Sequence, residues 1–259
     1  MSDRVYQAVN LLGRGLMRAL DLTVRTSGLE HLPTTGPVIL AATHVSYPDF
    51  VFIEKAAARR QRFVRFMCRH DVWNRRAVAW GMDRMQHVPV DREAPAYAYL
   101  RARRLLRQGE AVLLFPEAGI SYSYAVRPLM RGVAALARET GAPVVPVAVW
   151  GSQRVWSVGV PEPKPSWKRG RLVDVTFGAP LSAAARDDLT EWTIALGHRL
   201  TALLESLQRL PEHRPAPGER AVWYPAHLGG HAPTRAEALA LDEVPRSAIR
   251  PVWGPPTYG

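Results

Sequence analysis

Two residues whose types suit proton transfer lie close together in the segment 43–49, where His44 and Asp49 are five positions apart across a proline-containing turn. An aspartate that accepts a hydrogen bond from Nδ1 of a histidine fixes the ring tautomer and leaves Nε2 free to act as a base. The simpler interpretation is a loop histidine followed by an aspartate that caps the next helix. Ser46, between the two, is expected to be a turn or cap residue and not a nucleophile.

Two further charged residues, Arg92 and Glu117, also follow short apolar segments. Gly119 comes two positions after Glu117 and permits a tight turn there. Taken singly, each of these charged residues could be an ordinary surface residue.

Each of these polar sites is preceded by an apolar segment of strand length, at residues 38–42, 86–90 and 111–115. In open α/β sheets, ligands bind beyond the carboxyl ends of the strands. If the three strands are parallel neighbours, the four polar side chains converge on one crevice.

Along the whole chain, short apolar segments alternate with longer segments of helical periodicity. Strands are predicted at residues 38–42, 62–68, 86–90, 111–115, 143–149 and 172–177. Helices are predicted at residues 3–20, 49–59, 72–85, 94–107, 132–140 and 182–209, the last capped by Ser182. This alternation favours an α/β fold with a mostly parallel central sheet flanked by helices.

The pattern predicts three regions. Residues 1–27 form an N-terminal amphipathic helix and its lead-in, and residues 28–210 form the single α/β domain. Residues 211–259 form an irregular extension rich in proline and glycine, with one short helix near residues 234–241.

Composition narrows the function classes. The 259 residues carry 34 Lys and Arg against 23 Asp and Glu, a net charge of +11, and nearly all of the basic residues are arginines. Guanidinium groups bind phosphate in a bidentate way, which suits lipid or nucleic-acid phosphates. The single cysteine, Cys68, excludes an internal disulfide and a cysteine-based zinc site. The common nucleotide-loop, zinc-protease and serine-hydrolase motifs are absent from the sequence.

Any membrane contact is expected to be peripheral, because no apolar segment approaches the roughly 18 residues that a span requires. In the helix at residues 3–20, apolar residues recur at helical spacing: Val5, Val9, Leu12 and Leu16. Arg4, Arg14 and Arg18 lie away from that stripe. Two interpretations remain open: the stripe packs on the domain, or it enters an anionic lipid surface.

In order along roughly residues 28–178, these elements resemble the motifs of the glycerolipid acyltransferase family, which contains bacterial 1-acylglycerol-3-phosphate acyltransferases. The matching segments are His44 to Asp49, Val90-Asp91-Arg92, Phe115-Pro116-Glu117-Ala118, Leu129-Met130-Arg131-Gly132 and Val144-Val145-Pro146-Val147-Ala148. Ala118 stands where the family has glycine, Ile120 where many members have arginine, and Pro89 where phenylalanine is typical. The arginine bias and the extension are similar to actinobacterial members.

The resemblance implies transfer of a fatty acyl chain from acyl-CoA or an acyl carrier protein to the free hydroxyl of a lysophospholipid. The acceptor it favours is 1-acyl-sn-glycerol-3-phosphate, with phosphatidic acid as the product. In this interpretation His44 is the general base and Asp49 orients it, while Arg92 holds the acceptor phosphate. Glu117 binds the glycerol part or positions its loop, and backbone N–H groups near Gly119 contact phosphate or an oxyanion.

Ile120 lacks the positive charge that arginine provides in many family members. Arg127 or Arg131 is expected to supply that charge instead. No cofactor and no metal are expected. The partners expected are the two substrates and an anionic membrane surface, at the cytoplasmic face of the cell membrane, and no nucleic acid.

Three alternatives stay open. The same chemistry could act on another acceptor, such as glycerol-3-phosphate, a different lysophospholipid or a glycolipid. A hydrolase could use His44 to activate water. A non-enzymatic basic protein would instead bind membrane or nucleic acid in a salt-dependent way, and substitutions at His44 would not change this binding.

Overall fold

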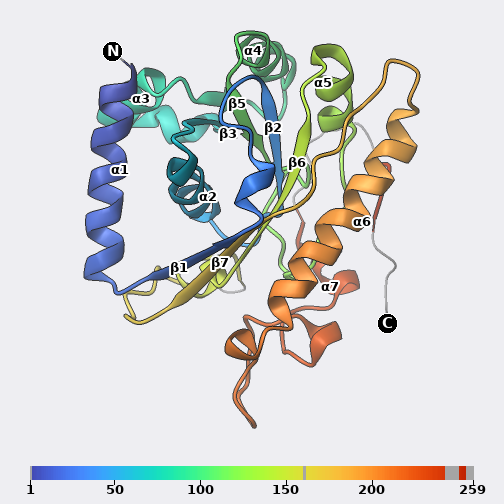
Figure 1. The fold of residues 1–259 in the computed structure, drawn as a ribbon. Coiled ribbons are helices and arrows are strands. Elements are labelled where there is room, and N and C mark those ends of the chain that lie inside the picture. Colours follow the sequence, from blue (N-terminus) through green and yellow to red (C-terminus); the bar gives the residue numbers. More distant parts are fainter. Residues whose placement is uncertain (1, 160–161, 243–250, 255–259) are drawn as a thin grey trace.

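The computed structural model describes residues 2–159, 162–242 and 251–254, which contain a seven-stranded sheet (Figure 1). The strand order is β1-β7-β6-β2-β5-β3-β4. The strands are β1 (Thr23–Ser27), β2 (Val38–Ala42), β3 (Val64–Arg69), β4 (Val88–Val90), β5 (Ala111–Leu114), β6 (Val144–Trp150) and β7 (Leu172–Phe177). All paired strands run parallel except β6 and β7. The predicted α/β fold with a mostly parallel sheet is confirmed.

The helices lie on both faces of this sheet (Figure 1). They are α1 (Ser2–Ala19), α2 (Asp49–Ala57), α3 (Arg76–Arg84), α4 (Ala96–Arg107), α5 (Gly132–Thr140), α6 (Leu189–Gln208) and α7 (Arg235–Leu241). Residues of α1 and α2 pack on one face, and residues of α4, α5 and α6 pack on the other.

The central strands are buried on both sides, which explains their unbroken apolar sequences. In β2, Ile39 and Ala41 join the core under α4, α5 and α6, whereas Val38 and Leu40 join the core under α2. Every residue of β2, β5 and β6 is buried. These strands therefore form a rigid base whose carboxyl ends are fixed relative to one another.

The expected start of the last long helix, with Ser182 as its cap, is wrong. Helix α6 begins at Leu189, and the side chain of Asp188 accepts hydrogen bonds from the backbone N–H groups of Thr190 and Glu191. An ionised aspartate is a strong cap because it also faces the positive end of the helix dipole. Ser182 instead accepts a hydrogen bond through its carbonyl, from the indole of Trp192.

The apolar stripe of α1 does not pack on the domain as a whole. The buried contacts of α1 come from Tyr6 and Met17, while Leu12 and Leu16 are 75% and 54% exposed. The hydroxyl of Tyr6 donates to a carboxylate oxygen of Glu54 in α2 at 2.9 Å. The packing interpretation of the stripe is therefore wrong for Leu12 and Leu16. In the described part of the chain, no helix is both long enough and apolar enough to cross a bilayer.

Described residues of the C-terminal extension pack against the domain. Ala221, Tyr224 and Trp253 belong to the same core as α4, α5 and α6. Helix α7 lies in the stretch where the sequence indicates a short helix, and Thr234 and Glu237 form a capping box at its start. Strand β1 was not anticipated, because Thr23–Ser27 is a half-polar edge strand with no apolar run.

Candidate active site

The loops that follow β2 and β5 carry the polar residues singled out above. These two strands are adjacent and parallel, with Val38 opposite Ala111 and Ala41 opposite Leu114. Their carboxyl ends therefore meet at one edge of the sheet, which brings His44 and Glu117 together, as expected for parallel neighbouring strands.

His44 and Asp49 form a hydrogen-bonded pair, with 3.0 Å between His44 Nδ1 and Asp49 Oδ2. The Asp49 carboxylate is fully buried and accepts five hydrogen bonds in all, the others coming from Val45 N–H, Ser46 N–H, Ser46 Oγ and Ser152 Oγ. The last of these spans 2.6 Å and reaches Asp49 from the turn after β6. A carboxylate held by this many donors is fixed in place.

The alternative in which Asp49 only caps the next helix is wrong. Asp49 is the first residue of α2, and no side chain caps that helix. Its carboxylate instead accepts from the N–H groups of Val45 and Ser46, which precede the helix. These N–H groups bind the same carboxylate oxygen that faces the imidazole of His44. Ser46 lies in this turn, as expected from the sequence.

Three contacts hold His44, two through its imidazole ring and one through its backbone. Its ring stacks on Phe115, with 3.8 Å between ring centroids and 13° between planes. Its backbone N–H donates to Glu117 Oε1 at 2.7 Å, and Nδ1 faces Asp49. The side chain keeps 16% of its surface exposed, so Nε2 is the ring nitrogen left to exchange a proton.

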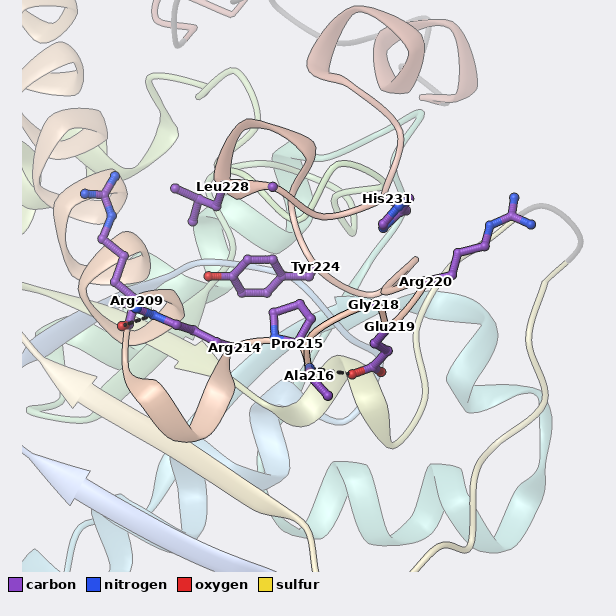
Figure 2. Close-up of a pocket in the computed structure, with 11 residues that line it drawn as sticks. Arg209, Arg214, Pro215, Ala216, Gly218, Glu219, Arg220, Tyr224, Leu228 and His231 are labelled. Atoms are coloured by element: carbon purple, nitrogen blue, oxygen red, sulfur yellow. Dashed lines mark hydrogen bonds between the residues drawn. The ribbon is translucent and has the colours of Figure 1, made fainter.

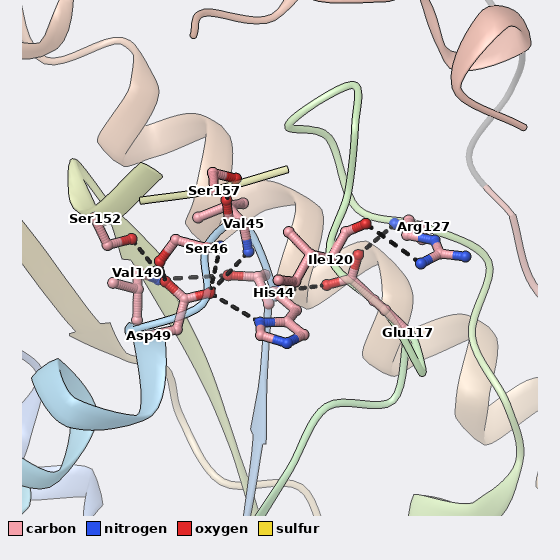
Figure 3. Close-up of polar contacts among 11 residues, drawn as sticks. His44, Val45, Ser46, Asp49, Glu117, Ile120, Arg127, Val149, Ser152 and Ser157 are labelled. Carbon is pink, nitrogen blue, oxygen red and sulfur yellow. Dashed lines mark hydrogen bonds and ion pairs between the residues drawn. The ribbon is translucent and has the colours of Figure 1, made fainter. Parts of the chain in front are cut away.

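Glu117 joins the two loops. It is buried, and its second oxygen, Oε2, accepts the backbone N–H of Arg127 at 2.7 Å (Figure 3). Burial raises the pKa of Glu117 to about 8, while the two backbone hydrogen bonds and the charge of Arg127 act in the opposite direction. Of the two roles expected for Glu117, this geometry supports the positioning of its loop, since both oxygens are occupied by backbone donors.

The turn after Glu117 contains Ala118 in the position where the family has glycine, followed by Gly119. Ala118 adopts a left-handed backbone conformation with φ of 53°, which glycine would adopt without strain. At Gly119, an added Cβ would lie 2.0 Å from Nη1 of Arg127, so the guanidinium occupies the space of a side chain. A side chain at 119 would therefore require the guanidinium of Arg127 to move, while the left-handed residue of the turn is Ala118.

The three arginines expected near the acceptor have different settings. Arg127 forms an ion pair with Asp242 of the extension, Nε to Oδ2 at 3.0 Å, so its charge already has a partner inside the protein. Arg131 is exposed and immediately precedes α5. Arg92 follows β4, and β3 lies between β4 and β5, so the backbones of these two strands are about 10 Å apart. The structure thus groups His44, Asp49, Glu117 and Gly119 closely, with Arg92 two strands away. Arg131 follows Met130, whose backbone N–H donates to the carbonyl of Pro116 at 3.1 Å.

Ser152 and Phe115 were not singled out from the sequence. Ser152 follows the carboxyl end of β6, the neighbour of β2, so the rule that found His44 and Glu117 also applies to it. Phe115 lies within the recognised Phe-Pro-Glu segment, and its stacking on His44 is the part that the sequence did not reveal.

A cavity of about 840 Å³ lies apart from this site, in the C-terminal extension (Figure 2). Its lining comes from the end of α6 and from residues 214–231, and it includes Arg209, Arg214, Arg220 and His231. In Figure 2 the side chains of Arg209 and Arg220 point away from each other. Within the described residues, no group of three or more His, Cys, Asp or Glu could hold a metal ion.

Comparison with protein families gives a match of residues 23–150 to the family model called Acyltransferase. That range contains every expected site residue: His44, Asp49, Arg92, Glu117, Gly119 and Arg131.

Three curated plant and algal proteins named 1-acyl-sn-glycerol-3-phosphate acyltransferase are similar to this chain. The Brassica napus protein is 26% identical over 136 residues, which are 51% of this chain and 38% of that protein. The Arabidopsis thaliana protein is 25% identical over 140 residues (52% and 38%), and the Chlamydomonas reinhardtii protein is 29% identical over 129 residues (48% and 38%). The chain thus spans well under half the length of these relatives.

Among solved structures, the 1-acyl-sn-glycerophosphate acyltransferase of Thermotoga maritima has a similar fold. The TM-score is 0.68, with 21% identity and 83% of each chain covered. The likeness extends over most of the chain, so the sheet and its flanking helices are shared.

Proposed function

Residues 23–150 make this chain a member of the glycerolipid acyltransferase family, and we propose that it transfers a fatty acyl chain from a thioester to the free hydroxyl of a lysophospholipid. The acceptor that we propose is 1-acyl-sn-glycerol-3-phosphate, which would give phosphatidic acid. The names of the three curated relatives support this acceptor. The donor is acyl-CoA or an acyl carrier protein.

The observation that carries the proposal is the contact of 3.0 Å between His44 Nδ1 and Asp49 Oδ2 at the carboxyl edge of the sheet. In the reaction, His44 Nε2 takes the hydroxyl proton as the acceptor oxygen attacks the thioester carbonyl. The C–S bond then breaks, and the imidazolium returns the proton to the leaving sulfur. Positioned general-base catalysis contributes about 10²–10⁴-fold.

Asp49 acts by orienting and charge compensation. Its hydrogen bond keeps the proton of neutral His44 on Nδ1, and its negative charge stabilises the imidazolium that forms. The hydrogen bonds from Ser46 and Ser152 hold the carboxylate where it can do both. Phe115 holds the ring plane, so the direction of Nε2 is set before substrate binds.

The acceptor phosphate is assigned to Arg92 and Arg131. Arg127 suits this role less, because binding phosphate would compete with its ion pair to Asp242. A charge-assisted hydrogen bond of this kind contributes about 1.5–3 kcal/mol. The exposed position of Arg131 before α5 supports its access to a ligand at this edge.

An acceptor with a long acyl chain resides in a bilayer, and we assign the membrane contact to α1, at the cytoplasmic face of the cell membrane. Leu11, Leu12 and Leu16 are exposed on this helix while Tyr6 and Met17 fix its other face. Arginines near an anionic surface contribute about 1 kcal/mol each, so the exposed basic residues of α1 would add to apolar insertion.

The experiment incubates the purified chain with oleoyl-CoA and, in parallel, an acylated carrier protein, against a panel of lysophospholipids, glycerol-3-phosphate and a glycolipid. Free thiol and lipid product are measured together. Product from 1-acyl-sn-glycerol-3-phosphate that depends on His44 supports the proposal. Thiol release without acceptor would instead identify a hydrolase, and product from another acceptor alone would replace the proposed substrate.

A further inference from the structure

We propose that Asp242, in the C-terminal extension, is a positioning residue for acyl transfer that holds the catalytic loop through Arg127. The effect of Asp242 on the rate of acyl transfer rests on the proposed function. It assigns to the extension a role in holding the loop that begins at Glu117.

A continuous set of contacts leads from Asp242 to the base. Its Oδ2 pairs with Arg127 Nε at 3.0 Å, and the two side chains are 4% and 12% exposed. The backbone N–H of Arg127 donates to Glu117, and Glu117 in turn accepts the backbone N–H of His44, each at 2.7 Å. Figure 3 shows His44, Glu117 and Arg127 following one another in this order.

The guanidinium also fixes the turn between Glu117 and Arg127. It occupies the space beside the Cα of Gly119, and its Nη1 donates to the carbonyl oxygen of Ile120 at 3.4 Å. One side chain thus contacts the turn at two residues, while its own backbone binds the buried glutamate. Any change in where Arg127 lies changes the support of that turn.

The extension attaches to this loop at a second place. Leu129 exchanges backbone hydrogen bonds with the segment 252–253: its N–H donates to Trp253 at 2.8 Å and its carbonyl accepts from Val252 at 3.1 Å. Trp253 is held in turn against α6, where a Cβ added at Gly197 would lie 2.3 Å from the indole. The loop is therefore held by the extension on both sides of Pro128.

The charge of Asp242 is directed at Arg127. Within the described residues, neither Oδ1 of Asp242 nor Nε of Arg127 has a hydrogen-bond partner, so the ion pair is what joins the two side chains. Removing the charge of Asp242 therefore acts on Arg127. Removing one partner of a buried ion pair leaves the other as an uncompensated charge, which then moves toward water. For Arg127, such a movement would withdraw the guanidinium from Gly119 and Ile120 and loosen the hydrogen bond to Glu117.

The test compares Asp242→Asn with Asp242→Glu in the full chain. Asp242→Asn keeps the size of the side chain and should lower kcat about tenfold, with the KM of donor and acceptor changed by less than about threefold. Asp242→Glu should restore most of the lost kcat. The matched control is Glu212→Gln, another carboxylate of the extension paired with an arginine, Arg25, but exposed; its kcat should stay within about twofold of the original.

Two results would overturn the proposal in this assay: a kcat of Asp242→Asn within twofold of the original chain, or a lower acceptor KM. The second would mean that Asp242 restrains a phosphate-binding Arg127. Whether Asp242 acts through Arg127 is tested with Arg127→Met alone and with Arg127→Met plus Asp242→Asn. Asp242→Asn should have no further effect once Arg127 is gone, whereas additive losses would show that Asp242 acts elsewhere.

Amide hydrogen exchange tests the contact without any activity. Asp242→Asn should speed exchange at the backbone N–H groups of His44 and Arg127, both of which bind Glu117, and Glu212→Gln should not. Unchanged exchange overturns the proposal. If the chain transfers no acyl group to any acceptor while exchange responds as expected, the proposed function fails and the positioning role of Asp242 stands.

Discussion

Ala118→Gly is expected to stabilise the protein, because Ala118 adopts a conformation that suits glycine. Its φ of 53° is left-handed, and such a conformation costs a residue with a Cβ about 1–2 kcal/mol. Glycine loses more conformational freedom on folding, which offsets about 0.5–1 kcal/mol of that gain. The side chain of Ala118 is exposed, so no buried contact is lost. The net gain in the free energy of unfolding is about 0.5–1 kcal/mol.

Differential scanning calorimetry measures this gain. For a domain of this size, 1 kcal/mol shifts Tm by about 2–4 °C, so Ala118→Gly should raise Tm by about 1–4 °C. The neighbouring position provides a control of opposite sign. Gly119→Ala places a Cβ against the guanidinium of Arg127 and should lower stability by about 1–3 kcal/mol. A lower Tm for Ala118→Gly, or an unchanged Tm for Gly119→Ala, would refute the loop geometry described above.

Three further predictions concern the acceptor, the membrane and pH. Arg92→Ala should raise the acceptor KM about tenfold or more and leave the donor KM near its original value, measured by steady-state kinetics; a change in donor KM alone would place Arg92 at the thioester. Leu12→Asp combined with Leu16→Asp should reduce sedimentation with anionic liposomes while keeping activity on a short-chain, water-soluble acceptor; unchanged sedimentation would exclude α1 as the contact. Burial raises the pKa of Glu54 to about 7, so the folded protein binds the proton more tightly and stability from this group falls as pH rises from about 4.5 to 7. Glu54→Gln should flatten this decline in thermal scans across that range, and an identical pH dependence in both proteins would contradict the assignment.

The central strands could be predicted from the sequence because burial on both faces leaves them uniformly apolar, as in β2 and β5. Strand β1 could not be, since its pairing with β7 depends on residues far along the chain and its own residues are half polar. The start of α6 was misplaced because Ser182 and Asp188 are both good caps, and only the bridge between Leu181 and Val144 shows that the chain is still extended there.

The helix α1 illustrates a second limit. Its periodicity identifies an amphipathic helix, but which face is buried depends on Tyr6 reaching Glu54 across the fold. The apolar stripe was correct as a pattern, but the buried face of the helix is the one that carries Tyr6, which contacts a residue 48 positions away.

In the site, local spacing was sufficient for His44 and Asp49, and strand topology was sufficient for Glu117. The contacts of Ser152 and Asp242 join residues more than a hundred positions apart, Asp49 in one case and Arg127 in the other. No periodicity or motif within either segment encodes such a pairing, so these contacts are visible only in the folded chain.

The measurement that tests the central claim most directly is the rate of acyl transfer by His44→Ala, with oleoyl-CoA and 1-acyl-sn-glycerol-3-phosphate as substrates and phosphatidic acid as the quantified product. Circular dichroism and thermal unfolding establish that the variant is folded, and His231→Ala, which changes an exposed histidine of the extension, is the matched control. General-base catalysis by His44 predicts a loss of about 10²–10⁴-fold in kcat for His44→Ala and none for His231→Ala. A folded His44→Ala variant with nearly the original kcat would contradict the proposed mechanism.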